Sequence, residues 1–140
     1  MSTDNVRTET REVSDFDRVA LAGFGDLHIR QGEEESLRIE ASPEILGRIK
    51  TEVKDGQLTI RFSRNWLDWI GEVLATGFAG MRVRYDLKVK ELTALAITGA
   101  GRVQVANMKA DHLALELRGA GQLSVESLDA ERLQVDLSGA

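Results

Sequence analysis

A Gly-x-Gly phrase flanked by alternating apolar residues recurs every 20 residues along the C-terminal part of this 140-residue chain. The copies read ITGAGRVQV, then LRGAGQLSV, and a third begins with LSGA at the end of the sequence. Aligned on their glycines, they form two apolar columns: Leu95, Leu115 and Val135, then Ile97, Leu117 and Leu137. An earlier copy, LAGFGDLHI, starts at Leu21. Four copies of one pattern with glycines at fixed positions indicate a repeat architecture.

Within each copy the apolar residues alternate with polar ones, which predicts short strands with one buried face. A 20-residue unit cannot bury that face alone, but it can do so when stacked on identical neighbours. The inward set of one coil is expected to be Thr93, Leu95, Ile97, Val103, Val105, Met108 and Ala110. We therefore predict an all-β parallel β-solenoid with coils of 20 residues. A β-sandwich or barrel of short strands remains the alternative, although it does not explain the matched columns.

The chain before the repeats is less regular. Residues 36–41 and 81–89 alternate as strands, and Ser42 followed by Pro43 predicts one short helical turn. Asp55-Gly56 predicts a hairpin turn between alternating arms. We expect a polar N-terminal tail over 1–10 and a single solenoid domain over 11–140.

Residues 65–80, NWLDWIGEVLATGFAG, break the β pattern and predict a short helical insert near 65–76. Its apolar residues are Trp66, Trp69, Ile70, Val73, Leu74 and Phe78. They can cover the coil, or they can form a surface that contacts a protein partner or a second subunit.

The charge and the residue composition of the chain exclude several function classes. The net charge is −5 and the sequence pI about 5.1, so no basic footprint for nucleic acid is present. Without cysteine the chain has no disulfides or thiolate metal sites. The sequence shows neither a signal peptide nor an apolar run long enough for a membrane span.

The repeated glycines invite comparison with a phosphate-binding loop, which the surrounding residues argue against. A dinucleotide fingerprint needs a third glycine and a following helix, whereas position 104 is Gln and the next residues alternate as a strand. We interpret the glycines as corners of the coil, where positive φ angles are needed. These corners are Gly23, Gly25, Gly99, Gly101, Gly119, Gly121 and Gly139. No cofactor is predicted.

Metal-binding and catalytic patterns are weak. Calcium-binding solenoids place Asp after their glycines, whereas Arg102 and Gln122 stand there. His28 and His112 lack ligand partners at useful spacing, so both are interpreted as surface residues and no metal site is predicted. Glu116 and Asp136 should stack one coil apart on the outer face, where a carboxylate pair can act on a polysaccharide. That enzyme remains an alternative, and no catalytic residue is assigned.

The last coil is expected to end in a strand with nothing stacked below it. Leu133, Val135 and Leu137 supply its apolar side. Because natural proteins cover such edges, we expect further coils in the full-length protein. An oligomer joined through this coil or through the insert is a further alternative.

The phrases REVSDFDRVALAGFGDLHIRQGEEESLRIEA, TEVKDGQLTIRF and the two full repeats resemble the bacterial putative auto-transporter adhesin, head GIN domain family. The resemblance implies a right-handed parallel β-helix, export to the cell envelope (periplasmic or extracellular) and no established catalytic residues. It favours a non-enzymatic, adhesin-like module that binds a protein or a cell-surface glycan. A polysaccharide lyase or hydrolase and an oligomeric scaffold stay open as alternatives.

Overall fold

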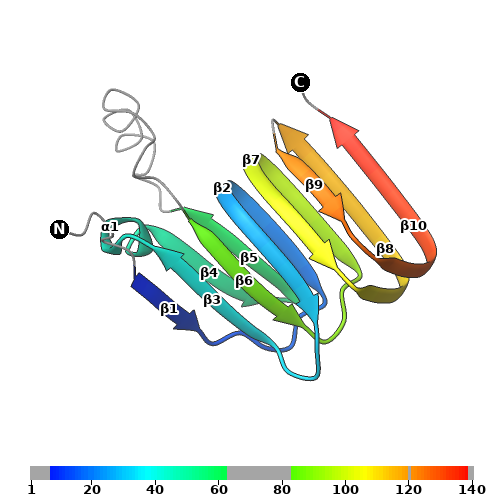
Figure 1. The fold of residues 1–140 in the computed structure, drawn as a ribbon, viewed down its shortest axis with the longest axis horizontal. Coiled ribbons are helices and arrows are strands. Elements are labelled where there is room, and N and C mark those ends of the chain that lie inside the picture. The colour runs from blue at the N-terminus through cyan, green and yellow to red at the C-terminus, as the bar shows by residue number, and fades with distance from the viewer. Residues whose placement is uncertain (1–6, 63–82, 120, 139–140) are drawn as a thin grey trace.

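The computed structural model describes residues 7–62, 83–119 and 121–138. Its elements, in chain order, are β1 (Arg7–Arg11), β2 (Arg18–Gln31), β3 (Ser36–Ala41), α1 (Pro43–Leu46), β4 (Ile49–Lys54), β5 (Gln57–Phe62), β6 (Arg84–Val89), β7 (Ala94–Ala106), β8 (Met108–Gly119), β9 (Gln122–Val125) and β10 (Leu128–Ser138). Apart from α1, the described chain is built from strands, so the all-β prediction is confirmed (Figure 1).

The long strands β2 and β7 each pass through two layers (Figure 1). Residues 18–21 of β2 pair with β5, whereas residues 26–31 pair with β6. The first layer, which we call the back layer, therefore runs β4-β5-β2-β7-β8-β10. The second, the front layer, runs β1-β3-β6-β2-β7-β9. The core lies between the two layers.

The repeats pair in parallel with like residues opposite one another. Leu95 lies opposite Leu115, and Leu115 opposite Val135. The columns at the interval of 20 are therefore confirmed. A parallel β-helix over residues 11–140 is not confirmed, because the sheet is mixed: β3 pairs antiparallel with β1 and β6, and β4 antiparallel with β5. Residues 7–10, which fall in the expected polar tail, form β1 together with Arg11.

Local sequence signals are reproduced where the structure describes them. Asp55 and Gly56 have φ angles of 52° and 79° and join β4 to β5 as a hairpin. Pro43 begins the single turn of α1, although the hydroxyl of Ser42 makes no capping hydrogen bond. The helical insert near 65–76 lies outside the described residues.

The core is apolar, and its enclosure decreases toward the C-terminal end. Tyr85, Leu27, Ile39 and Leu58 are fully buried, and the described residues include no buried charged side chain. In β10, by contrast, Leu133, Val135 and Leu137 are 48%, 49% and 65% exposed. The exposed terminal strand expected from the sequence is therefore present.

In β2 and β7 the Gly-x-Gly segments cross from one layer to the other inside a continuous strand. A Cβ on Gly23 would lie 2.6 Å from the ring of Phe62, and one on Gly25 would lie 2.5 Å from the ring of Tyr85. Both glycines have positive φ angles, 134° and 130°. Phe24 between them stacks on Phe62 with ring centroids 4.6 Å apart. These glycines make room for aromatic rings of the core.

Candidate functional site

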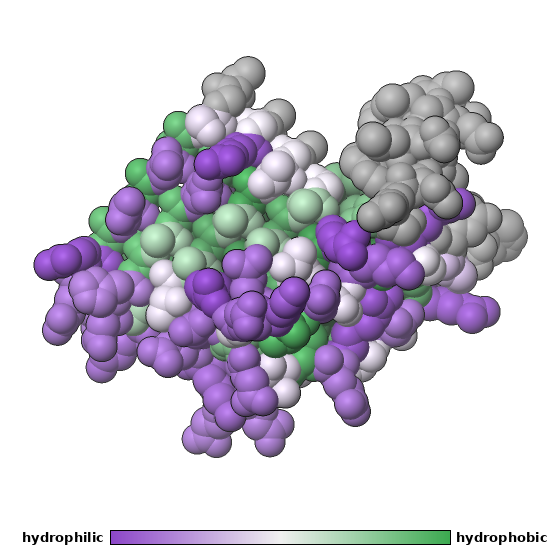
Figure 2. Space-filling view, turned by 180° about the vertical axis from the view of Figure 1, so that it is seen from behind, coloured by the Kyte–Doolittle hydropathy of each residue, from purple (hydrophilic) through white to green (hydrophobic). Residues whose placement is uncertain are grey.

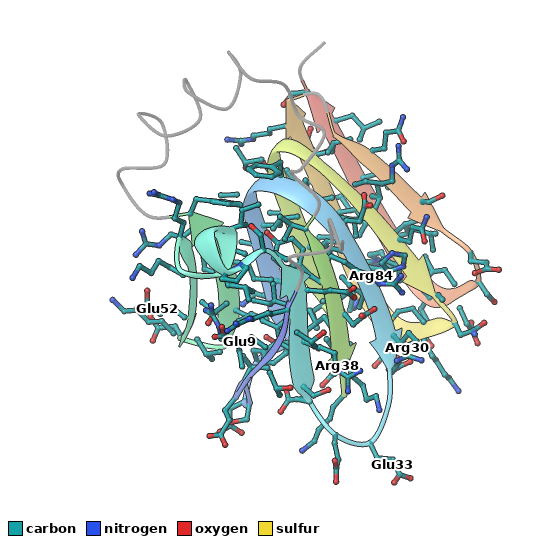
Figure 3. The ribbon with its side chains drawn as sticks, turned by 60° about the vertical axis from the view of Figure 1, so that its left-hand side comes forward. Glu9, Arg30, Glu33, Arg38, Glu52 and Arg84 are labelled. Atoms are coloured by element: carbon teal, nitrogen blue, oxygen red, sulfur yellow. The ribbon has the colours of Figure 1, made fainter. Side chains whose placement is uncertain are left out.

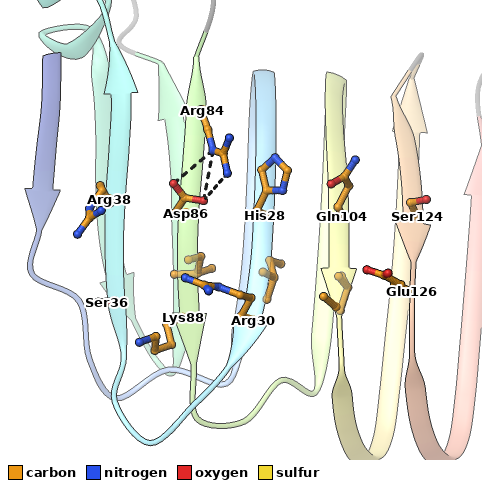
Figure 4. A pocket seen from close by; sticks show the side chains of 14 residues that line it. His28, Arg30, Ser36, Arg38, Arg84, Asp86, Lys88, Gln104, Ser124 and Glu126 are labelled. Atoms are coloured by element: carbon orange, nitrogen blue, oxygen red, sulfur yellow. Dashed lines mark hydrogen bonds and ion pairs between the residues drawn. The ribbon is translucent and has the colours of Figure 1, made fainter. Parts of the chain in front are cut away.

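Outward side chains of the front layer surround an open hollow of about 650 Å³, which we call the polar hollow (Figure 4). β3, β6, β2, β7 and β9 contribute to it. The lining residues are His28, Ile29, Arg30, Ser36, Arg38, Arg84, Asp86, Leu87, Lys88, Gln104, Val105, Ala106, Ser124 and Glu126. Because side chains alternate along a strand, these polar residues stand outward between buried apolar neighbours.

Strand pairing arranges the polar side chains in rows across the hollow. One row is Arg38, Asp86, His28, Gln104 and Ser124, each opposite the next on a neighbouring strand. The adjacent row is Ser36, Lys88, Arg30 and Ala106. Neighbouring strands lie about 4.8 Å apart. The rows therefore offer regularly spaced hydrogen-bonding groups across five strands.

The hollow is positively charged, although the chain as a whole is acidic. Four cationic side chains and two carboxylates line it, whereas the whole sequence has 18 basic and 23 acidic residues. Figure 3 shows Arg30, Arg38 and Arg84 in the front layer, away from Glu52 on β4. The positive charge is thus a local property of this face.

The cations of the hollow differ in their partners. Arg84 forms an ion pair with Asp86, with 3.4 Å between Nε and Oδ2. Arg30, Arg38 and Lys88 make no hydrogen bond or ion pair within the described residues. We call these three the cation cluster. Arg30 lies directly opposite Lys88 across the β2–β6 pair, and like charges in that position repel.

Gly32 helps to place one member of this cluster. A Cβ on Gly32 would lie 2.9 Å from Cδ of Lys88. The aliphatic stem of Lys88 therefore packs over the glycine, while its ammonium group is available to solvent or ligand.

The outer surface of the back layer is different. Its outward positions on β2, β7 and β8 include Ala20, Ala22, Ala94, Ala96 and Ala114. Figure 2, seen from behind, shows apolar and neutral residues in a band across the middle, with charged residues along its margin. The middle of this layer therefore presents short side chains, and longer charged side chains lie around it.

The carboxylate pair expected from the sequence lies on this back surface. Glu116 is opposite Asp136 on one side and Ala96 on the other, as predicted. Arg118 forms an ion pair with Glu116, with 2.6 Å between Nε and Oε1. Neither carboxylate lines the polar hollow. The structure therefore separates this pair from the main concave site.

The two histidines occupy unlike positions. His28 is half-buried and lines the polar hollow, whereas His112 is exposed on β8 opposite Arg132. In the part of the chain that the structure describes, no group of three or more His, Cys, Asp or Glu residues is placed to hold a metal ion. Among the same residues, no helix has the length and apolar character needed to cross a bilayer.

The other residues singled out from the sequence are either structural or not described. Gly99 and Gly119 stack on the preceding coil, since a Cβ on either would approach a glycine carbonyl oxygen to 2.4 or 2.6 Å. Gly101 and Gly121 are also tightly packed, but neither has the positive φ expected from the sequence, so close packing rather than backbone conformation favours glycine there. Gly139 lies outside the described residues. The proposed partner contacts Trp66, Trp69, Ile70, Val73, Leu74 and Phe78 lie outside them as well.

Tyr85 lies beneath the crossing segment of β2. Its hydroxyl donates a hydrogen bond to the carbonyl oxygen of Phe24 at 3.1 Å. Burial raises the pKa of Tyr85 well above its usual range, and the positive charge of Arg11 acts in the opposite direction. The phenol stays neutral and acts as a core residue.

Sequence reasoning missed the cation cluster. Each member stands at an outward position of an alternating strand, so its exposure was predictable. The pairing of β3, β6 and β2 that gathers the three charges was not predictable from local pattern. The signal that remains in the sequence is a basic residue at an outward position of each of three separate strands.

The family model for the putative auto-transporter adhesin, head GIN domain, matches residues 15–140. A comparison with curated proteins gave no match. Among solved structures, a putative adhesin from Bacteroides fragilis has a TM-score of 0.82 at 20% identity, covering 99% of this chain and 61% of that one. A putative lipid binding protein from Parabacteroides distasonis has a TM-score of 0.66 at 19% identity, covering 98% and 63%.

A putative adhesin from the same Parabacteroides species has a TM-score of 0.62 at 16% identity, covering 96% of this chain and 63% of that one. At these identities the likeness shows a shared fold. The chain spans less than two thirds of the length of each of these structures.

Proposed function

The chain belongs to the putative auto-transporter adhesin, head GIN domain family, and from this premise we propose that it is a non-enzymatic, adhesin-like module of the bacterial cell envelope. It binds a macromolecule in the periplasm or outside the cell, through the outer surface of its front layer. The family and two of the solved structures described above support an adhesin-like role at the cell surface.

The polar hollow is the observation that carries this proposal. It is open, it spans five strands, and it offers rows of polar side chains rather than a deep enclosed cavity. A surface of this kind suits an extended polymer better than a small buried substrate, for which enclosed apolar pockets are usual. The lipid-binding name of one structural neighbour has no counterpart in this hollow, where Ile29, Leu87 and Val105 are at most 1% exposed.

The scaffold for this surface is the repeated coil. We propose that residues 94–138 form a parallel β-helical coil, right-handed as the family resemblance implies. The parallel pairing of β7, β8 and β10 with like residues in register supports it. The coil holds the outward rows in a fixed geometry, which reduces the entropy lost on binding.

A binding panel with a turnover assay tests the proposal. The purified chain is immobilised and presented with dextran, polygalacturonate, dextran sulfate, collagen and fibronectin. We expect saturable binding to at least one of them, with the polymer length unchanged after long incubation. The absence of binding to every member contradicts a binding role. Shortened polysaccharide favours instead a lyase or hydrolase, with Glu116 and Asp136 as the residues to substitute first.

A further inference from the structure

We propose that the polar hollow binds an acidic polysaccharide, with the cation cluster of Arg30, Arg38 and Lys88 contacting its carboxylate or sulfate groups. This inference rests on the proposed binding function and names the chemical class of the ligand at that same site.

The cation cluster carries positive charge that no partner within the described residues neutralises. The three cations stand on the adjacent strands β3, β6 and β2, and two of them face each other directly. The nearest carboxylate in the rows, that of Asp86, is already paired with Arg84. An anion between Arg30 and Lys88 relieves their repulsion and gains charge-assisted hydrogen bonds. The cluster is therefore complementary to a carboxylate or a sulfate.

Neutral and acidic polar side chains surround the cation cluster. Ser36, Gln104 and Ser124 supply neutral donors and acceptors, and His28 lies beside them. Asp86 and Glu126 supply acceptors without extra donors. A sugar ring with several hydroxyls and one acidic group needs this mixture. Its hydroxyls donate to the carboxylates, and its acidic group meets the cations.

The lining of the hollow favours a glycan over other polyanions. The lining contains no Phe, Tyr or Trp on which a nucleobase can stack. It also presents no exposed apolar side chain, which an anionic lipid surface requires for insertion. A hydroxyl-rich polymer that carries acidic groups remains the best complement.

The chain offers a matched control for the test. Lys50 and Arg61 are a second pair of opposed cations, exposed in the back layer, and Lys54 lies on the same strand as Lys50. None of the three lines the polar hollow. The variant Arg30→Gln/Arg38→Gln/Lys88→Gln and the control Lys50→Gln/Lys54→Gln/Arg61→Gln therefore remove the same charge from different faces. Far-UV circular dichroism and thermal melting show whether both variants keep the fold.

The experiment measures binding of the full chain and both variants to polygalacturonate, dextran sulfate, neutral dextran, collagen, fibronectin and phosphatidylglycerol vesicles by biolayer interferometry. We expect the unchanged chain to bind one or both acidic polymers and to ignore dextran. The cluster variant should lose at least tenfold in affinity, and the control less than twofold. Affinity should fall with rising salt, since exposed charges are screened. The affinities for polygalacturonate and for dextran sulfate show whether the site prefers a carboxylate or a sulfate.

Each other outcome overturns a defined part of the account. If acidic polysaccharide binds equally well to the cluster variant, the site is wrong but a binding function stands. Binding only to dextran, collagen or fibronectin shows that the ligand class is wrong. If the chain binds phosphatidylglycerol vesicles more tightly than either polysaccharide, and the cluster variant loses that binding, the ligand of the hollow is a membrane surface. Binding to nothing in the panel rejects the proposed function together with this inference.

Discussion

The column formed by Leu95, Leu115 and Val135 is enclosed at one end of the molecule and open at the other. Leu95 and Leu115 are 1% and 4% exposed, whereas Val135 is 49% exposed. All three occupy the same position of the same repeated phrase and pair in register. What differs is the neighbour: β7 lies between β2 and β8, while β10 has one paired side among the described strands.

The N-terminal end is covered by antiparallel strands and α1 instead of by another repeat. Arg11 donates hydrogen bonds to the carbonyl oxygens of Leu46 and Ile49, both at 3.1 Å, and so ties β1 to α1 and β4. Leu37 and Ile39 of β3 are fully buried beneath this cover. The repeat therefore defines the register of strand pairing, whereas the burial of an apolar side chain depends on what covers that end of the coil.

The largest expected effect tests this difference within the column. Leu95→Ala should lower the free energy of unfolding by about 2–5 kcal/mol, because it leaves a cavity in an enclosed core. Val135→Ala, at the exposed end, should change it by about 0.5 kcal/mol or less. Urea unfolding followed by far-UV circular dichroism measures both. Equal losses would show that β10 is as enclosed as β7.

A second prediction concerns the stacked glycines. A Cβ on Gly99 would lie 2.4 Å from the carbonyl oxygen of Gly23, at a φ of 116°, and backbone atoms cannot move aside easily. Gly99→Ala should therefore cost about 3 kcal/mol, near the upper end for a strained backbone position. Gly56→Ala, at a φ of 79° with its nearest atoms 3.4 Å away, should cost about 1 kcal/mol. Thermal melting ranks the two. A reversed order contradicts close stacking of the coils.

Tyr85→Phe removes the hydrogen bond to the carbonyl oxygen of Phe24 and should cost about 1 kcal/mol at neutral pH, less than Leu95→Ala or Gly99→Ala. Burial raises the pKa of Tyr85 in the folded state, so its contribution is complete below the unfolded pKa of about 10 and is lost as the pH rises above it. The difference in unfolding free energy between the two proteins should shrink, then reverse, above that pH. A constant difference contradicts a buried phenol.

Much of the repeat region was predictable, because local patterns encode it. The interval of 20 gave the register of β7, β8 and β10, and Asp55-Gly56 gave the hairpin of β4 and β5. The antiparallel strands were not predictable as a set. Ser36 pairs with Lys88, 52 positions away, and no local period records such a contact.

The same reason hides most of the site. Alternation shows that Arg30, Arg38 and Lys88 point outward, but only the order of β3, β6 and β2 makes them neighbours. The consecutive carboxylates of Glu33–Glu35 predict a solvated turn. Glu35 instead accepts hydrogen bonds from the backbone N–H groups of Asp15 and Phe16, at 2.9 and 3.3 Å. Charge alone does not distinguish a solvated carboxylate from one that holds a loop.

The measurement that tests the central claim most directly is hydrogen exchange of the whole chain with and without polygalacturonate. We predict slower amide exchange in residues 26–31, 36–41 and 84–89, which form the strands of the cation cluster, and no change in β4 or β10. This result locates the ligand on the front layer and leaves the open end of the coil free. Slower exchange confined to β8 and β10, or no change despite saturable binding, would contradict the account.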